Sequence, residues 1–260
     1  MYTNLYKKLK YHFILLGFLS LLVSCRNQPY RIDTVKSGQT KIDSNLTSDP
    51  SITKFVEPYK DKLEKEVNVV LSYTSKTLTR EDGELQSSLG NIYADICFQK
   101  ANPKFKKIIN KEIDMAMFNY GGVRQAINKG EIKVKDVFKL MPFENMLVVV
   151  ELDGKQIKEL FKYFEKEQKA HPLSGVNLGF NGEKLKKITI HDKPFDETKN
   201  YYVLTSDYLQ HGGDHMDFFK NPVNLYSLNY KVRDALLDYM KEKDTVRIEL
   251  DNRVIIDNNP

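Results

Sequence analysis

The chain has 260 residues, and its 40 lysines and arginines against 35 acidic residues give a formal net charge of +5 at pH 7. Three of the lysines lie in the first 25 residues, so without that segment 37 basic residues face 35 acidic ones, a formal +2. A chain this close to charge balance, with no basic stripe, is not expected to bind nucleic acid.

Residues 1–25 have the parts of a secretory signal sequence: a start with three lysines, an apolar run over residues 13–23, and the end Leu22-Val23-Ser24-Cys25, which resembles a lipobox. The apolar run is shorter than the roughly 20 residues that a membrane-spanning helix needs. We therefore predict an exported protein, anchored to the bacterial cell envelope (periplasm or outer membrane) by a lipid on Cys25. The alternative is an ordinary cleaved signal with an incidental cysteine.

Residues 26–50 are rich in Asn, Ser, Thr and Asp and poor in large apolar side chains, which predicts a flexible tether. The folded domain is then expected to cover residues 51–257, a size within the range of one domain. With Cys25 assigned to a lipid, Cys97 is the only other cysteine. It lies on an apolar helical face, so we expect it to be buried and structural.

Hydrophobic periodicity predicts a mixture of helices and strands in this domain. Helices are expected at residues 51–66, 89–100, 155–168 and 232–241, short helical turns at 125–128 and 135–140, and strands at 67–73, 115–120, 146–152, 176–180, 185–191, 201–206 and 245–256. Ser87-Ser88 is expected to cap the second helix, and Asp153-Gly154 to form a turn. These elements do not alternate as regular βαβ units. We therefore predict a single α+β domain with a mixed β-sheet flanked by helices.

Residues 114–151 hold the first candidate site. An apolar strand ends at Gly121-Gly122, Arg124 follows, and the chain returns through Pro142-Phe143-Glu144-Asn145 into a second apolar strand. Paired glycines let backbone N–H groups approach a ligand closely, and a guanidinium matches phosphate or carboxylate. The pattern favours an anion site, although a glycine pair near an arginine is often plain turn chemistry. Asn119, before the glycines, is expected to cap the turn.

Residues 206–214, Ser-Asp-Tyr-Leu-Gln-His-Gly-Gly-Asp, hold the second candidate site. Here too a strand end meets a glycine pair. Phe143 and Tyr208 can sandwich a planar ring, while Asp214 accepts hydrogen bonds from amino or hydroxyl groups. Together with Arg124, these side chains match the parts of a nucleotide. Core packing of the two rings and turn capping by Asp214 are the alternatives.

Four motifs make the sequence recognisable: GNIYADI from Gly90, FNYGGVR from Phe118, LMPFENMLVVVELDGKQIKEL from Leu140 and SDYLQHGGD from Ser206. In this order and spacing they resemble the C-terminal, substrate-binding domain of the 5'-nucleotidase family. The resemblance covers about residues 51–257, and it implies the fold of that domain and nucleotide binding.

For the phosphate, the resemblance implies contact with Arg124, on the turn of Gly121 and Gly122. Family members also carry phosphate-binding arginines upstream of the GNIYADI motif. Only Arg80 is near that position here, and its register is uncertain. Part of the anion site is therefore in doubt.

For the base and the ribose, the resemblance implies that Phe143 stacks on the base, that Asn145 hydrogen-bonds near it, that Tyr208 is the second stacking ring and that Asp214 grips the ribose hydroxyls. Two positions depart from the family pattern. Tyr208 stands where relatives usually have Phe. Glu144 replaces a usual Gly, and its side chain either narrows the pocket or points to solvent.

The metal-ligand motifs that phosphoester hydrolysis requires are not found in this sequence. A two-metal phosphatase needs clustered Asp, His and Asn ligands, and the family's Asp-x-His and Gly-Asn-His-Glu signatures do not occur. His211 and His215 flank Asp214, but we interpret their loop as part of ribose recognition. We assign no catalytic residue and no metal ligand to this chain.

We therefore predict the nucleoside- or nucleotide-binding half of a 5'-nucleotidase. Catalysis would require a divalent metal carried by a separate metallophosphoesterase polypeptide, so whether this chain is itself an enzyme stays open. One alternative is a non-catalytic envelope lipoprotein that binds nucleosides. Another is a degenerate relic that binds none.

Overall fold

The computed structural model describes residues 6, 10–12, 14, 31–247 and 249–257. The chain divides into two units, Met1–Ile52 and Thr53–Pro260. Cys25 and most of the predicted signal sequence lie outside the described residues, as does the start of the predicted tether. No helix in the described part of the chain combines the length and the apolarity that crossing a membrane requires.

The second unit holds most of the regular structure. Its helices are α2 (Pro50–Val67, which begins in the first unit), α3 (Ser88–Ile109), α4 (Val134–Leu140), α5 (Gly154–Glu167), α6 (Asp207–Gln210) and α7 (Val232–Lys241), with 3-10 turns η1 (Tyr120–Gly122), η2 (Gly213–His215) and η3 (Asp217–Phe219). Its strands are β1 (Val70–Thr74), β2 (Met115–Met117), β3 (Gly130–Lys133), β4 (Met146–Leu152), β5 (Leu173–Ser174), β6 (Val176–Asn181), β7 (Lys184–Ile190), β8 (Lys193–Pro194), β9 (Tyr201–Ser206), β10 (Asn224–Lys231), β11 (Thr245–Val246) and β12 (Val254–Asp257).

The central sheet has the strand order β10-β4-β9-β2-β5. Strands β2 and β9 are parallel and the other neighbours are antiparallel, so the sheet is mixed. Smaller sheets have the orders β11-β1-β3 and β12-β6-β7-β8. The predicted α+β domain with a mixed sheet and flanking helices is confirmed.

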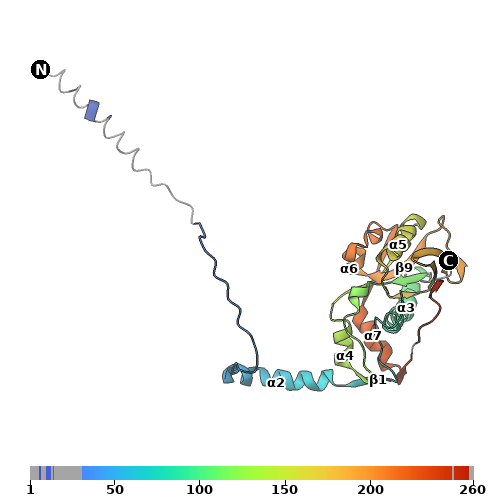
Figure 1. Cartoon of the computed structure of the whole chain (residues 1–260), viewed down its shortest axis with the longest axis horizontal. Helices are drawn as coiled ribbons and strands as arrows, with labels where there is room; N and C mark the ends of the chain where they lie inside the picture. Colours follow the sequence, from blue (N-terminus) through green and yellow to red (C-terminus); the bar gives the residue numbers. More distant parts are fainter. Residues whose placement is uncertain (1–5, 7–9, 13, 15–30, 248, 258–260) are drawn as a thin grey trace. The chain divides into compact units, whose positions relative to one another are not determined.

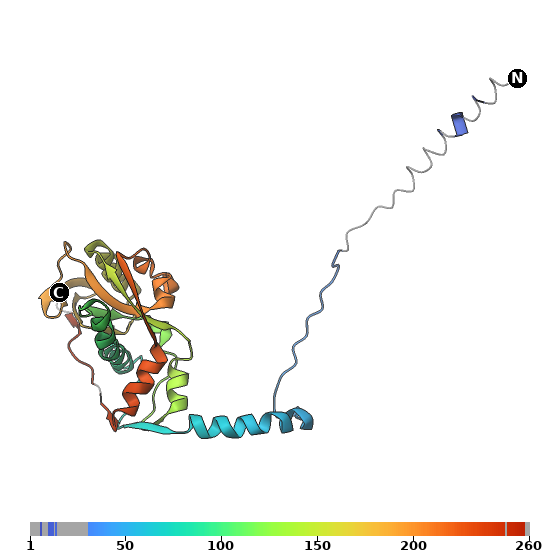
Figure 2. The same cartoon turned by 180° about the vertical axis from the view of Figure 1, so that it is seen from behind.

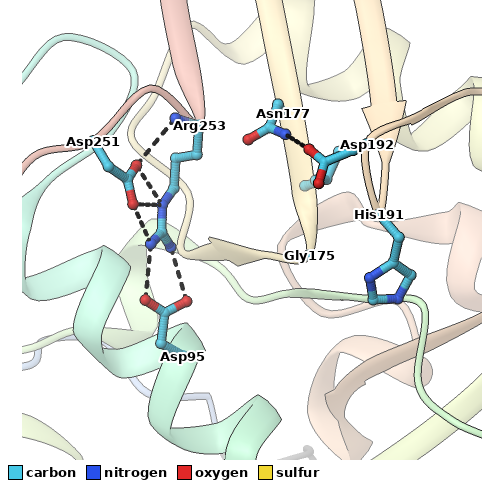
Figure 3. Close-up of a pocket in the computed structure, with 8 residues that line it drawn as sticks. Asp95, Gly175, Asn177, His191, Asp192, Asp251 and Arg253 are labelled. Atoms are coloured by element: carbon cyan, nitrogen blue, oxygen red, sulfur yellow. Dashed lines mark hydrogen bonds and ion pairs between the residues drawn. The ribbon is translucent and has the colours of Figure 1, made fainter.

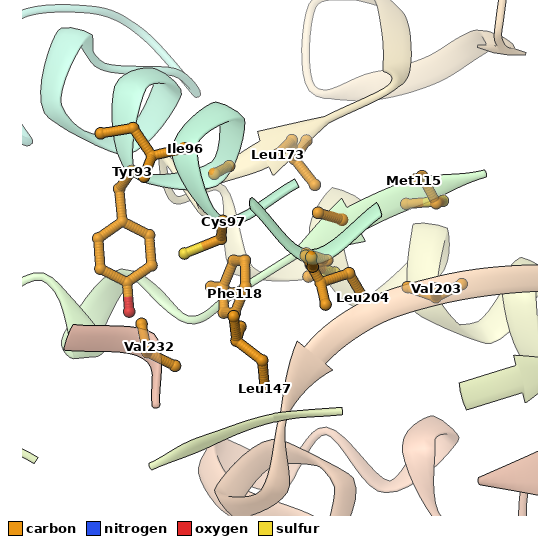
Figure 4. Packing of buried hydrophobic residues seen from close by; sticks show 14 of the residues in the cluster. Tyr93, Ile96, Cys97, Met115, Phe118, Leu147, Leu173, Val203, Leu204 and Val232 are labelled. Carbon is orange, nitrogen blue, oxygen red and sulfur yellow. The ribbon is translucent and has the colours of Figure 1, made fainter. Parts of the chain in front are cut away.

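Helices cover both faces of the central sheet (Figures 1 and 2): α3 and α7 pack on one face and α5 on the other. The continuous apolar run of β4 follows from this, because Leu147 to Val150 are all buried. Cys97 of α3 lies in the core near Phe118 (Figure 4) and has no solvent exposure. Burial raises the pKa of its thiol, and the expected burial of this cysteine is confirmed.

Side-chain caps start α3 and α5, two of the helices that flank the sheet. The predicted cap of α3 is present, since Ser87 Oγ accepts a hydrogen bond from Gly90 N at 3.0 Å. Asp153, which was expected to form a turn with Gly154, instead caps α5 by accepting from Gln156 N at 2.8 Å. The chain therefore enters α5 directly from β4.

The structure differs from the predicted elements in several places. Helix α3 continues to Ile109 instead of ending at residue 100, and the short strands β3, β5 and β8 were not predicted. Residues 125–128 form no helical turn, because Ile127 pairs with Leu78 in an isolated β-bridge. The predicted strand 245–256 is two short strands, β11 and β12, in different sheets. Strand β10 was not predicted, although Tyr226, Leu228 and Tyr230 alternate with polar residues.

Candidate functional site

The glycine pair forms the 3-10 turn η1 directly after β2. Gly122 N donates to Asn119 O at 3.0 Å, which closes the turn. A Cβ on Gly122 would lie 2.6 Å from Asn119 Oδ1, so a larger residue would displace that amide. The need for glycine at this position is therefore steric.

Two arginines contact the turn from different sides. Arg124 Nη1 donates to Gly121 O at 3.3 Å, and the guanidinium carbon lies 5.9 Å from the centroid of the Phe143 ring. Arg80 Nη1 donates to Val123 O at 3.0 Å, and its guanidinium lies 4.4 Å from the centroid of the Tyr120 ring. Arg80 thus supports the backbone of the turn, whereas Arg124 lines the cavity described below.

Phe143 lies on the loop between α4 and β4, and 41% of its surface is exposed. The loop is held at several points. Val232 N donates to Asn145 O at 3.0 Å, Met146 N donates to Asp207 Oδ1 at 3.0 Å, and Arg233 Nη1 donates to Phe143 O at 3.2 Å. A large aromatic ring is therefore presented to solvent on an anchored backbone.

Glu144 does not narrow the cavity, because it is not among the lining residues, and its side chain is 63% exposed, so the expectation that it points to solvent is confirmed. Its carboxylate accepts hydrogen bonds from Lys231 Nζ and Arg233 Nη2. These two hydrogen bonds lower the pKa of Glu144 to about 2, and the bond from Lys231 has the larger effect. Sequence reasoning missed both basic partners because they lie almost 90 residues further along the chain.

Tyr208 and Asp214 are joined by a hydrogen bond at the end of β9. Ser206 caps the short helix α6, which carries Tyr208, and Asp214 follows in a left-handed conformation at φ 52°. The Tyr208 hydroxyl donates to Asp214 Oδ1 at 2.8 Å, a bond that raises the pKa of Tyr208. Tyr163 Oη donates to Asp214 O at 2.9 Å, so both the backbone and the carboxylate of Asp214 are held.

Asn119 does not cap the turn as expected, because its side chain makes no capping hydrogen bond. Its Nδ2 instead donates to Asp214 Oδ2 at 2.7 Å. Each oxygen of Asp214 thus accepts from a protein donor and keeps lone pairs for others. Asn119 thereby links the two glycine-containing segments, which a local sequence pattern does not reveal.

One cavity of about 250 Å³ brings the predicted residues together. It is lined by Asn119, Gly121, Gly122, Arg124, Phe143, Asn145, Tyr208 and Asp214. All seven residues that the sequence predicts for substrate binding are present, and Asn119 is added to them. Phe143 and Tyr208 are 41% and 45% exposed, so neither side chain is buried in the hydrophobic core.

A second cavity of about 540 Å³ shares Gly121, Tyr208 and Asp214 with the first. His171, which is 4% exposed, lies in its wall and accepts a hydrogen bond at Nδ1 from Tyr120 N at 3.1 Å. Burial lowers the pKa of His171 to about 4, so the ring is neutral at pH 7 and can accept. Sequence reasoning gave His171 no role beyond a loop, but it supports the glycine turn.

A third hollow contains a charge cluster around Arg253 (Figure 3). Its Arg253 pairs with Asp95 at 2.8 Å and with Asp251 at 2.7 Å, and donates to Leu173 O. The guanidinium is fully engaged and fastens the C-terminal segment to α3 and β5, which is a structural role. Within the described ranges, no group of three or more His, Cys, Asp or Glu residues is arranged to hold a metal ion.

The sequence matches the model of the family described as "5'-nucleotidase, C-terminal domain" over residues 67–221, more than half of the chain. It is 21% identical to an apyrase from Tabanus yao, over 83% of this chain and 43% of the apyrase. It is 25% identical to a 5'-nucleotidase from Vibrio vulnificus (strain CMCP6), over 69% of this chain and 32% of that protein.

Among solved structures, the fold is similar to that of a 5'-nucleotidase precursor from Thermus thermophilus, with a TM-score of 0.68 and 22% identity over 80% of this chain. It is also similar to an NAD nucleotidase from Haemophilus influenzae, with a TM-score of 0.61 and 16% identity over 82% of this chain. The chain spans less than half the length of each relative, between 32% and 43%.

Proposed function

Because the chain belongs to the family of 5'-nucleotidase C-terminal domains, we propose that it provides the nucleotide-binding part of a nucleoside 5'-monophosphate phosphatase. The observation that carries the proposal is the meeting of two exposed aromatic rings, an arginine and a fixed carboxylate in one cavity. These groups match the three chemical parts of a nucleotide, which are an aromatic base, a ribose diol and a phosphate.

The base is the part assigned to Phe143 and Tyr208. Stacking a base on an aromatic side chain is worth about 1–3 kcal/mol and tolerates every base, because each base has a π face. Asn145 lies at the same cavity wall and has both a donor and an acceptor for a base edge. Stacking thus supplies affinity, and the amide can supply selectivity.

The ribose is assigned to Asp214. Tyr208 and Asn119 each donate to one of its oxygens, at 2.8 and 2.7 Å, so the carboxylate is already oriented before a ligand arrives. The remaining lone pairs can accept from the two ribose hydroxyls. A carboxylate held in this way loses little freedom on binding, which favours affinity.

The phosphate is assigned to Arg124. Its guanidinium makes one hydrogen bond, to Gly121 O, and its other N–H groups can donate in pairs to phosphate oxygens. The backbone N–H groups of a glycine turn can add donors. Arg80 is not assigned to the phosphate, because it does not line this cavity and instead bonds Val123 O and contacts the Tyr120 ring.

We further propose that the hydrolytic metals come from a separate metallophosphatase polypeptide. The size of the cavity supports this. Its volume of about 250 Å³ is smaller than the roughly 300–1,000 Å³ of most ligand pockets, so a bound nucleotide would extend beyond it toward another surface. A divalent metal carried by that polypeptide would supply an activated water for attack on the phosphate.

Calorimetry with adenosine and AMP tests the binding role. We expect both ligands to bind, AMP more tightly, and Phe143→Ala to weaken both by about 5- to 150-fold, the loss of one stacking partner. Equal affinities of wild type and Phe143→Ala would remove the stacking role. Absence of any binding by the wild type would refute the proposed function.

Phosphate release from AMP with Mn²⁺ or Zn²⁺ tests the division of labour. We expect no turnover by this chain alone and turnover when a metallophosphatase polypeptide from the same cell is added. Strong hydrolysis by this chain alone would overturn the two-chain scheme. Tight binding with no effect of any such partner would favour a binding protein without catalysis.

A further inference from the structure

Arg233, the second residue of α7, is tied to the loop that carries Phe143. It is 6% exposed, and its Nη1 donates to Phe143 O at 3.2 Å and to Met141 O at 3.3 Å. The guanidinium also lies 4.3 Å from the centroid of the Phe138 ring on α4. Arg233 therefore connects α7, α4 and the backbone of the loop on which the aromatic ring stands.

Glu144 completes this connection from within the loop. A guanidinium so nearly buried is costly unless it is paired. Glu144 pairs it, and the same carboxylate accepts from Lys231 at the end of β10. The two neighbours of Glu144 in sequence, Phe143 and Asn145, line the cavity, whereas Glu144 does not. One short segment thus presents two side chains to the cavity and one to the basic pair.

We propose that Glu144, Arg233 and Lys231 form a positioning cluster that holds the Phe143 ring in the orientation required for stacking on the base. The inference rests on the proposed function and deepens it. Immobilising a side chain during binding costs about 0.5–1.5 kcal/mol, and a ring that is already fixed avoids that cost. The cluster acts through Phe143 and touches no substrate.

A ligand-free measurement tests whether the cluster fixes the ring. The chain contains no tryptophan, so Phe143→Trp introduces a single tryptophan at this position, whose emission can be excited apart from that of the tyrosines. In that background we expect Glu144→Ala to increase nanosecond motion, seen as faster anisotropy decay and stronger acrylamide quenching. The matched control is Glu131→Ala, which removes a glutamate in a surface ion pair with Lys133 at 3.1 Å, away from the cavity. Identical decays for the Glu144→Ala and Glu131→Ala proteins would overturn the proposal.

A binding measurement without the reporter tests whether this fixation is used. Glu144→Ala should weaken the binding of AMP by about two- to twelvefold. The affinity for ribose 5-phosphate, which lacks the base, should not change. A merely structural role would weaken both ligands together. Lys231→Ala removes one partner only and is the milder variant if Glu144→Ala does not fold; the same split between ligands is expected. Failure of the wild type to bind AMP would refute the proposed function, while the anisotropy result would still decide whether the cluster holds the ring.

Discussion

Replacing Gly213 with alanine should displace the Tyr208 ring, one of the two proposed stacking rings, while Tyr208 itself is not mutated. A Cβ on Gly213 would lie 2.4 Å from both Cε1 and Cζ of Tyr208, whereas ordinary contacts begin at 3.4 Å. The ring must then retreat by about 1 Å. Because its hydroxyl bonds Asp214 Oδ1 at 2.8 Å, the same movement strains the contact that orients the carboxylate. The perturbation therefore affects the base and the ribose positions together.

The expected loss follows from these two contacts. If the Tyr208 ring is displaced, up to the full stacking contribution of about 1–3 kcal/mol is lost, which raises the Kd for adenosine by up to about 5- to 150-fold. Calorimetry measures the affinity, and a thermal melt verifies that Gly213→Ala is folded. Gly38→Ala is the control, since a Cβ there meets no atom within 4 Å. A folded Gly213→Ala protein with wild-type affinity for adenosine would refute the assignment of Tyr208 to the base.

Three further outcomes are expected. Arg124→Ala should weaken the binding of AMP about 10- to 150-fold, which is the contribution of hydrogen bonds to a charged group, and should leave the affinity for adenosine unchanged. Equal losses of affinity for both ligands would contradict phosphate binding by Arg124. Because burial lowers the pKa of His171 from 6.5 to about 4, the unfolded chain binds the proton more readily. Stability should therefore fall by about 3 kcal/mol as the pH drops from 6.5 to 4, and urea titrations of His171→Gln should show a flatter dependence. If Cys25 carries a lipid, Cys25→Ser should move the protein from the membrane fraction to the soluble fraction of expressing cells; an unchanged distribution would exclude the anchor.

The local sequence pattern predicted the elements that depend on their own residues. The closing helix α7 has the predicted bounds, Val232–Lys241, and the cap at Ser87 was found from its position before an apolar run. Strand β10, of eight residues, was missed because it lies at the edge of the sheet and half of its residues are exposed, which leaves few buried apolar positions to mark it. Residues 125–128 were misread because Ile127 is extended by its pairing with Leu78, a partner almost 50 residues away.

The residues of the candidate site were largely predictable, because their chemistry and the family resemblance of the motifs placed Arg124, Phe143, Tyr208 and Asp214 in one group. Their supports were not. The sequence offers Asn119 as a turn former, since an Asn before two glycines caps turns elsewhere. Only the packing of η1 against η2 turns its amide toward Asp214.

The sequence by itself indicated the fold class, the place of most elements and seven of the eight residues that line the cavity, because these follow from periodicity, from short motifs and from the family resemblance that the motifs carry. The tertiary structure alone decided how those side chains are held. Glu144 meets Lys231 and Arg233, and His171 meets the backbone of Tyr120, across gaps of about 50 to 90 residues. Such pairs form only when the folded sheet brings distant strands and helices together, and no local pattern of residues encodes that proximity.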